Sequence, residues 1–414
     1  MSTLYPNPAG AIETRDAEKA PDAGHPAALP PLHVRFLSQN RPGPRMGMGH
    51  YERLLIQSLL AASAAQNAGA SQNAGASQNG WRFEIRFAGR VPRADLEVSE
   101  EVGLTGATCE GYSPDRLAGL PWPAARAVLG LTHRLPPPDL YHSLSLAYPA
   151  PGGRPVVYTI HDLPPARFHD EGRLPRWAKE AAGAASAIFT PSQFAKSEMV
   201  TLLGLPEERV HVVPNGYERD VFHPGVAAAN PAALAARGIN GPFLLYVGGF
   251  TQRKNVRALL EAWTQVAPCF SDLSLVLAGP KDSLAALLAD TPAPRVVLAG
   301  YLDRAALPGV LKAATALVYP SIYEGFGLPP LEAMALGVPV VAVRAGAVPE
   351  VTGDCAVLAQ GGTPDSLAEA LLSLLENPTL ASSLSHRGPE QAGLFSWEDH
   401  AARVLQIYGS VTAR

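Results

Sequence analysis

The sequence predicts an α/β protein made of two doubly wound, Rossmann-like domains of similar size. Short, near-continuous apolar runs alternate with helix-like segments along the 414 residues. This is the pattern of parallel strands that are covered by helices on both faces. A stretch rich in alanine, proline and glycine at 222–241 separates two such series and is interpreted as the linker region. One domain usually takes about 150 residues, so the length allows two or three domains.

The composition is that of a globular protein in a reducing compartment. Hydrophobic residues make up 47% and charged residues 17%, with a net charge of −4, so nucleic acid is not an expected partner. The three cysteines, Cys109, Cys269 and Cys355, lie far apart without a C-x-x-C pair, which excludes a disulfide scaffold or a thiolate zinc site. No apolar stretch is long enough to span a membrane. We expect a cytoplasmic protein.

The first domain is expected at 31–225, after a disordered tail at 1–30. The tail is rich in Ala, Pro, Asp and Glu and lacks the apolar region of a secretory signal. The domain opens with a strand at 32–37, a glycine-rich turn and a helix at 51–65. Further strands are expected at 82–88, 140–142, 156–160, 187–190 and 210–213.

A low-complexity insert is expected at 66–80. The hexapeptide QNAGAS at 66–71 repeats at 72–77 and begins again at Gln78. Small polar residues cannot bury a core, so the whole insert is interpreted as an expanded loop. Residues 116–134, with Trp122 and scattered arginines, form the one candidate patch for peripheral contact at the inner face of a membrane, although an ordinary domain surface explains them as well.

The second domain is expected at 226–395. Its strands are predicted at 243–247, 273–278, 296–299, 316–319 and 338–343, and helices at 256–266 and 307–314. In doubly wound sheets, ligands bind beyond the carboxyl ends of the strands. The chemistry is therefore expected in the loops that follow strands, in a cleft where the two domains face each other.

The loop after the strand at 316–319 carries two carboxylates, Glu324 and Glu332, eight positions apart. Gly325 and Gly327 allow a ligand to approach the backbone, and two prolines suit the first turn of the helix that follows. The N-terminus of that helix attracts an anion such as a diphosphate. A carboxylate is a good acceptor for paired sugar hydroxyls. Either glutamate alone could simply be solvated, but together with the glycines and prolines they favour an extended nucleotide-sugar ligand.

The loop after the strand at 243–247 carries two glycines and two cations. Gly248 and Gly249 end the strand, and Arg253 and Lys254 follow. Adjacent cations behind a glycine turn suit a diphosphate, because they supply charge and several N–H donors.

The segment EGFGLPPLEAMALGVPVVA at 324–342 resembles the E-x7-E signature of the retaining glycosyltransferases of family 4. The resemblance extends over nearly the whole chain from Leu32 onward. It implies the GT-B fold, in which two Rossmann-like domains face each other across the active-site cleft. It also implies that the last segment, 396–414, is a helix that crosses back to the first domain.

The resemblance implies a role for each matching residue of the second domain. Glu324 would contact hydroxyls of the donor sugar, and Glu332 the ribose of the nucleotide. Arg253 and Lys254 would neutralise the departing diphosphate. The remaining donor contacts are implied for Gly248 and Gly249, for the backbone of Gly325, Phe326, Gly327 and Leu328 along the sugar and phosphates, and for the backbone of Tyr301 and Leu302 at the base.

Two segments of the first domain match the family as well. The glycine-rich loop with Gly47 and Gly49 would lie near the donor phosphate and the acceptor, and Met46 departs there from the usual glycine. His161 and Asp162 end an apolar strand at the place of the family's H-D or H-E pair. The resemblance implies that His161 hydrogen-bonds the donor sugar, while Asp162 orients it or faces the acceptor.

The function expected from these matches is the retaining transfer of a hexose, mannose as the best candidate, from a nucleoside diphosphate sugar. The acceptor would be a hydroxyl of a glycan or lipid-linked glycan in polysaccharide or glycoconjugate synthesis. The donor would be GDP-mannose or a UDP-hexose such as UDP-glucose. No D-x-D triplet occurs, so metal-independent activity without a cofactor is expected. A GT-B nucleotide-sugar epimerase and a non-catalytic nucleotide-sugar-binding scaffold are the alternatives, and the oligomeric state stays open.

Overall fold

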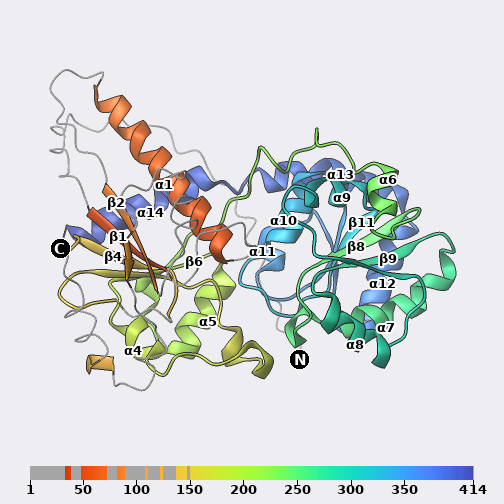
Figure 1. The fold of residues 1–414 in the computed structure, drawn as a ribbon, viewed down its shortest axis with the longest axis horizontal. Coiled ribbons are helices and arrows are strands. Elements are labelled where there is room, and N and C mark those ends of the chain that lie inside the picture. Colours follow the sequence, from red (N-terminus) through yellow and green to blue (C-terminus); the bar gives the residue numbers. More distant parts are fainter. Residues whose placement is uncertain are drawn as a thin grey trace.

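A computed structural model gives the fold and describes residues 33–38, 48–71, 82–88, 108–110, 122–124, 137–146 and 150–413. These residues form two α/β domains, each built around one parallel sheet (Figure 1). The two doubly wound domains expected from the sequence are therefore present.

The first sheet has the order β3-β2-β1-β4-β5-β6-β7 among the described residues, and every neighbouring pair is parallel. The short apolar segments Val156–Thr159 and Ala187–Thr190 are buried throughout, as in strands that helices cover on both faces. The strands are β1 His33–Ser38, β2 Arg82–Ala88, β3 Thr108–Glu110, β4 Leu140–Ser143, β5 Val156–Thr159, β6 Ala187–Thr190 and β7 Val210–Val212, and the helices are α1 Met48–Ser71, α4 Ala178–Gly183 and α5 Gln193–Leu203.

The second sheet has the order β10-β9-β8-β11-β12-β13 and is also parallel throughout. Its strands are β8 Phe243–Val247, β9 Ser274–Ala278, β10 Val296–Gly300, β11 Ala316–Tyr319, β12 Val340–Val343 and β13 Val357–Ala359. The helices are α6 Pro231–Ala235, α7 Val256–Val266, α8 Lys281–Asp290, α9 Leu307–Ala313, α10 Leu328–Ala335, α11 Val348–Thr352, α12 Pro364–Leu375 and α13 Pro378–Ala392.

Strand order determines where a ligand can bind. In the second sheet the order reverses between β8 and β11, which are neighbours in the sheet although they are separated in sequence. The loops that follow these two strands therefore leave the sheet side by side, and a crevice at such a reversal is the usual ligand site of this architecture. The first sheet reverses in the same way between β1 and β4.

Successive residues of β8 show how each domain is held together. Leu245 and Val247 join one buried apolar cluster, whereas Leu244 and Tyr246 join a second cluster on the opposite face of the sheet. Because side chains alternate along a strand, a fully apolar strand is stable only when both faces are covered. The first sheet likewise separates two buried clusters.

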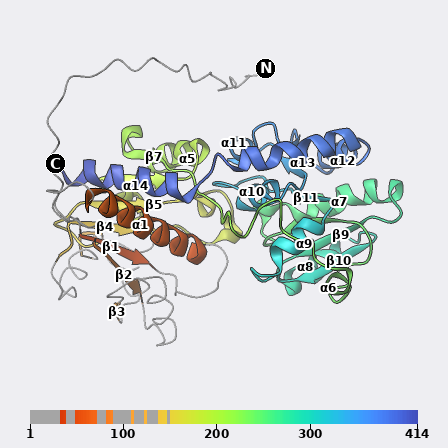
Figure 2. The same ribbon diagram turned by 90° about the horizontal axis from the view of Figure 1, so that it is seen from above.

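The last helix, α14 Trp397–Thr412, packs against α1 of the first domain (Figures 1 and 2). Trp397 and Tyr408 belong to the same buried cluster as Phe36 of β1. Two segments connect the domains, one after β7 and one just before α14, and they meet at Gly216. A Cβ atom at this position would stand 2.3 Å from the backbone nitrogen of Trp397. A side chain at position 216 would therefore push the two connections apart.

Two segments differ from the expectation. Gln66–Ser71 continues α1, because the alanine and glutamine of the repeat are good helix formers; only this part of the insert is described. The segment 222–241 is not a free linker, since Phe222 and Ile239 are buried in the core of the second domain and α6 lies between them. Apart from residues 122–124, the candidate membrane patch at 116–134 lies outside the described residues, and Trp122 packs partly against the core of the first domain.

Candidate functional site

The site is centred on Glu324, which lies between β11 and α10 and is only 7% exposed. Lys254 donates to Glu324 Oε1 at 2.6 Å, and Arg253 Nη1 donates to Oε2 at 2.9 Å. Both cations belong to the short 3₁₀ turn Gln252–Lys254 that follows β8. The sequence places these residues 70 positions apart or more, and the adjacency of β8 and β11 brings them into one cluster.

The electrostatics of this cluster keep Glu324 ionised. Burial by itself raises the pKa of Glu324, but the charges of Lys254 and Arg253 outweigh burial and lower the pKa below its ordinary value. The carboxylates around Arg253 raise the pKa of its guanidinium, although burial opposes them. The ammonium of Lys254 also lies 5.5 Å from the centre of the Tyr319 ring. In this cluster the carboxylate of Glu324 is thus paired with the ammonium of Lys254 and the guanidinium of Arg253.

Two carboxylates that sequence reasoning missed reach this loop from the first domain. Glu171 Oε1 accepts from Arg253 Nε at 2.7 Å and from the Thr251 hydroxyl at 2.6 Å. Asp170 Oδ2 accepts from the backbone N–H of Gln252 at 2.6 Å. Both residues lie in the 3₁₀ turn His169–Glu171, seven or more positions after the His161-Asp162 pair. The sequence signal that could have identified them is that two adjacent acidic residues, Asp170 and Glu171, follow the His161-Asp162 motif in the same loop region.

His161 and Asp162 lie at the same junction of the two domains. A Cβ atom on Gly325 would stand 2.2 Å from the carbonyl oxygen of His161, so the backbones of the two loops are in direct contact. The Gly325 N–H donates to Asp162 Oδ2 at 3.3 Å. Burial raises the pKa of Asp162 to about 6, and the charge of Arg253 partly opposes this shift.

His161 is a neutral imidazole in this environment. Burial, assisted by His400, lowers the pKa of His161 to about 3. Its Nε2 atom is buried and has no hydrogen-bond partner among the described residues. A buried polar atom without a partner is unusual, and at a junction of domains it is a position where a ligand hydroxyl can supply the missing bond.

Glu332 belongs to a second ionic cluster, which is separate from that of Glu324. Arg304 Nη1 donates to Glu332 Oε1 at 2.7 Å, and the same guanidinium binds Glu218, just after the connection between the domains. Glu218 also accepts from Arg53 at 3.2 Å and lies 3.0 Å from His50, both on α1. Burial raises the pKa of Glu332, and Arg304 opposes that shift. Sequence reasoning missed both Arg304 and Glu218. Arg304 could have been found, because it lies two positions after Leu302, one of the predicted contacts to the nucleotide base.

The glycine-rich turn between the two glutamates has the expected form. Gly327 precedes α10 with a φ of +114°, a conformation that favours glycine, and Leu328 is the first helical residue. Pro329 and Pro330 follow and have no N–H, so within this first turn Leu328 is the donor that stays available to an anion. Phe326 is buried, and the centre of its ring lies 5.6 Å from the centre of the Phe395 ring.

The other predicted donor contacts are dispersed. Gly248 and Gly249 follow β8 directly, and the hydroxyl of Tyr246 donates to the Gly249 carbonyl. Tyr301 follows β10 and is 55% exposed, whereas the side chain of Leu302 is buried in the core, so only its backbone can meet a base. Gly49 lies in the first turn of α1, and Gly47 lies outside the described residues.

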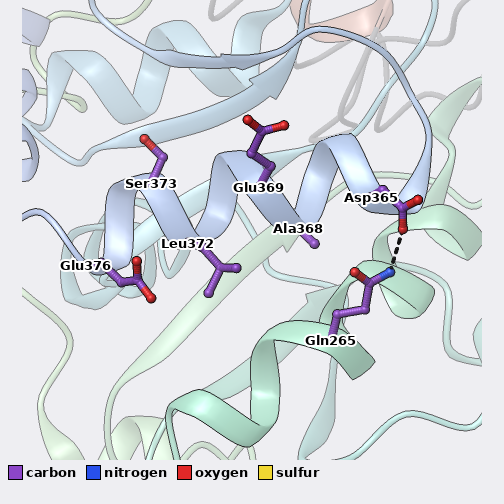
Figure 3. Close-up of a pocket in the computed structure, with 7 residues that line it drawn as sticks. All are labelled: Gln265, Asp365, Ala368, Glu369, Leu372, Ser373 and Glu376. Carbon is purple, nitrogen blue, oxygen red and sulfur yellow. Dashed lines mark hydrogen bonds between the residues drawn. The ribbon is translucent and has the colours of Figure 1, made fainter.

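Figure 3 shows a separate groove of about 460 Å³ between α7 and α12. Its walls carry three carboxylates, Asp365, Glu369 and Glu376, and Gln265 of α7 donates to Asp365 at 3.0 Å. The residues that line this groove include no cation, so it is unsuited to a diphosphate.

Metal-binding clusters and membrane-spanning helices are both absent from the described residues. No group of three or more histidine, cysteine, aspartate or glutamate side chains in the described ranges has an arrangement that could hold a metal ion. None of the described helices is both long and apolar enough to cross a membrane.

Comparison with known proteins identifies the family. The model described as Glycosyltransferase Family 4 matches residues 76–221, and the one described as Glycosyl transferases group 1 matches 241–377. O-antigen chain mannosyltransferase B of Escherichia coli is 31% identical over 282 residues, which cover 65% of this chain and 74% of the relative. The chain belongs to glycosyltransferase family 4. This glycosyltransferase is also 33% identical over 301 residues to alpha-maltose-1-phosphate synthase of Mycolicibacterium smegmatis, with 66% and 76% of the two chains covered.

Solved structures support the fold of the glycosyltransferase. Sucrose-phosphate synthase from Thermosynechococcus elongatus superposes with a TM-score of 0.68 at 20% identity, covering 92% of this chain and 99% of that one. Anabaena HepE in complex with UDP-glucose superposes with a TM-score of 0.66 at 19% identity, covering 92% and 100%. The GT-B fold expected from the sequence is confirmed.

Proposed function

We propose that this glycosyltransferase moves a hexose, mannose as the first candidate, from a nucleoside diphosphate sugar to an acceptor hydroxyl with retention of anomeric configuration. The acceptor would be a glycan or a lipid-linked glycan in polysaccharide or glycoconjugate synthesis. The observation that carries the proposal is the cluster of Glu324, Arg253 and Lys254 at the point where the strand order of the second sheet reverses.

In this proposal the two cations act on the leaving group. Bond breaking places negative charge on the diphosphate, and fixed cations that already point toward that position stabilise the charge without further reorganisation. Lys254 and Arg253 are held by Glu324, and both keep N–H donors beyond those that bind it. They supply the charge that a divalent cation provides in other transferases, so the activity is proposed to need no metal.

Glu324 and His161 hold the donor sugar. The ionised carboxylate of Glu324 can accept from sugar hydroxyls, which requires that the hydroxyls replace part of its ion pair with Lys254 and Arg253. The neutral imidazole of His161, with Nε2 lacking a partner, suits a further hydroxyl. Fixing the sugar at several points brings the reacting carbon and the acceptor into reacting geometry.

Proton transfer is assigned to the substrate itself. Among the described residues of this site we see no side chain that is suited to act as a covalent nucleophile, since the ion pairs occupy Glu324 and the Gly325 N–H binds Asp162. The departing diphosphate would accept the proton of the acceptor hydroxyl on the face from which it leaves. Transfer on that same face retains the anomeric configuration.

The choice of mannose rests on sequence similarity. O-antigen chain mannosyltransferase B is among the relatives, and it is 31% identical. UDP-glucose is the alternative, because the structure of Anabaena HepE with UDP-glucose has the same fold, although at 19% identity. The exposed ring of Tyr301 lies where the nucleotide base would approach, and such a ring accepts either base by stacking.

A donor screen tests the proposal. Purified protein is incubated with GDP-mannose, UDP-glucose, UDP-galactose, UDP-N-acetylglucosamine or ADP-glucose, and release of the nucleoside diphosphate is followed. We expect turnover of one donor, reduced by about 100-fold or more in each of two variants. Lys254→Ala removes a cation that stabilises the departing diphosphate, and Glu324→Ala removes the carboxylate that holds the donor sugar. Glu369→Gln removes a carboxylate from the groove of Figure 3 and is the matched control, with unchanged turnover expected.

The same assay separates the alternatives. Turnover of GDP-mannose supports mannosyl transfer, and turnover of UDP-glucose alone replaces mannose by glucose. Isomerisation of the free donor without release of nucleotide would favour an epimerase, and binding without any reaction would favour a scaffold. An inverted anomer in the isolated product contradicts retention, and activity that is lost in EDTA and restored by a divalent ion contradicts metal independence.

A further inference from the structure

Arg253 is held by carboxylates from both domains. Glu171 of the first domain binds its Nε at 2.7 Å, and Glu324 of the second domain binds its Nη1 at 2.9 Å. The Tyr323 carbonyl also accepts from Nη1, at 3.2 Å. The third nitrogen, Nη2, makes no hydrogen bond to any described residue. The planar guanidinium is therefore fixed in rotation and presents one edge that is available to a ligand.

Glu171 and Asp170 contact the same loop in different ways. Among the described residues, Asp170 binds only the backbone N–H of Gln252, so within them it ties the two domains together without contacting a charged group. Glu171 binds the guanidinium itself and adds a bond from the Thr251 hydroxyl. The side chains of Arg253 and Glu171 are each only 16% exposed, so water screens their interaction weakly. Asp170 can thus be removed to measure the effect of the domain tie alone.

We propose that Glu171 is a positioning residue of the transfer reaction. It orients the Arg253 guanidinium so that Nη2 points to the departing diphosphate, and it does so from the opposite domain. The orientation exists only while the two domains are in contact, so activation of the leaving group depends on that contact. This inference rests on the proposed function, because it takes Arg253 as the cation that meets the diphosphate.

The test compares four variants with the wild type in the donor assay. Glu171→Gln keeps an oxygen acceptor but removes the charge, and Glu171→Asp keeps the charge on a shorter side chain. Asp170→Ala removes the domain tie alone. Asp290→Asn breaks an exposed pair with Arg257 that is not part of the ionic cluster of Glu324, and it is the control with unchanged kinetics. Thermal unfolding of each variant verifies that it is folded.

An interaction made mainly in the transition state lowers kcat while KM stays nearly constant. We expect Glu171→Gln to lower kcat by about 10-fold or more with less than about a threefold change in the donor KM. Glu171→Asp should recover part of kcat. Asp170→Ala should instead raise KM with a smaller effect on kcat, since it weakens the contact between the domains but leaves the guanidinium paired.

Each other outcome overturns the inference in a recognisable way. Equal kinetic patterns in Glu171→Gln and Asp170→Ala would make Glu171 a tie between domains and nothing more. A higher kcat or a lower KM in Glu171→Gln would make Glu171 a competitor of the diphosphate. If the wild type turns over a donor and Glu171→Gln matches it, only the inference fails. If the wild type neither turns over nor binds any of the donors, the proposed function fails with it.

Discussion

The imidazole of His161 lies edge-on against the ring of Tyr51, with 4.1 Å between the ring centroids and an interplanar angle of 85°. Tyr51 belongs to α1, and its hydroxyl lies 3.3 Å from Nε2 of His400 on α14. His400 Nδ1 lies 2.8 Å from the Pro214 carbonyl, which can only accept, so Nε2 is the nitrogen that accepts from Tyr51. A helix at the end of the chain therefore supports the side chain that is expected to meet the donor sugar.

Replacing Tyr51 should separate stability from activity. Tyr51→Phe keeps the ring against His161 but leaves His400 Nε2 buried without a donor, so we expect a loss of about 1–3 kcal/mol in the free energy of unfolding and little change in kcat. Tyr51→Leu removes the ring contact and frees the imidazole, which should lower kcat by about tenfold or more. Chemical unfolding and the donor assay measure the two effects. Wild-type kcat in a folded Tyr51→Leu protein would mean that His161 needs no support from this ring.

Stability should fall steeply as the pH drops below about 6.5. Burial lowers the pKa of His142 and His161 to about 3 and that of His400 to about 4. Between pH 6.5 and 4 the unfolded chain binds up to three protons at these residues that the folded protein does not bind. The raised pKa of Asp162, about 6, works in the opposite direction by up to one proton. The unfolded chain thus binds roughly two protons more than the folded protein. The free energy of unfolding should therefore fall by about 3 kcal/mol for each pH unit by which the pH decreases.

Urea unfolding at several pH values between 8.5 and 4.5 measures this slope. His142→Gln removes one of the three histidines, so its stability should depend on pH less steeply, by about one proton. The two proteins should have parallel curves above pH 7.5, where none of these groups changes its charge. A wild-type curve that is flat from pH 6.5 to 5 would contradict the burial of neutral histidines.

The contact between the loops of Gly325 and His161 should not tolerate a methyl group. A Cβ atom at position 325 would stand 2.2 Å from the His161 carbonyl oxygen and 2.8 Å from the Asp162 Cβ, and the first of these is backbone. Gly325→Ala should therefore force the two domains apart, with donor turnover reduced by about 100-fold or more because the two halves of the site are separated. Gly361→Ala is the matched control, since nothing lies within 4 Å of its Cβ position.

Small-angle X-ray scattering should then give a larger radius of gyration for Gly325→Ala than for the wild type or Gly361→Ala. An unchanged radius together with full activity would mean that the loops shift locally to accept the methyl group. The contact between the domains would then be looser than the geometry indicates.

The strands were predictable because they are buried on both faces. Fully apolar runs such as 243–247 and 316–319 match β8 and β11 residue for residue. The two strands that sequence reasoning missed, β3 and β13, each have three residues and form the edges of their sheets. So short a segment gives little periodic signal, and neither has the concentration of β-branched residues at 210–213 that made the equally short β7 predictable. The helical start of the hexapeptide repeat was missed because its composition suggested a loop, although its alanine and glutamine residues are good helix formers.

Residues of the site were predictable in each domain separately, whereas the contacts between the two domains were not. Glu324, Arg253 and Lys254 were expected near each other because loops after neighbouring parallel strands share one end of the sheet. Glu171 meets Arg253 from 82 positions away, across the boundary between domains. Such a pair depends on how two rigid bodies are oriented, and no local pattern encodes that orientation. The same reason applies to Glu350 of the second domain, which meets α5 of the first domain.

Glu350 on α11 of the second domain caps the N-terminus of α5 in the first domain. Its carboxylate accepts from the backbone N–H groups of Gln193 and Phe194 at 2.8 Å and 2.7 Å. A carboxylate at a helix N-terminus satisfies free donors and offsets the positive end of the helix dipole, a gain of about 1 kcal/mol for an exposed group. Because this pair joins two domains, its loss should weaken their contact rather than the folding of either domain.

Glu350→Ala is therefore expected to raise the donor KM and the radius of gyration in solution while each domain stays folded. Adding salt should reduce the difference between the variant and the wild type, since screening weakens an exposed charge interaction in the wild type as well. Glu369→Ala, an exposed carboxylate on α12, is the control and should match the wild type in both measurements. If Glu350→Ala keeps the wild-type KM and radius at low salt, the remaining contacts, chiefly those of Glu171 and Gly325, suffice to hold the domains together.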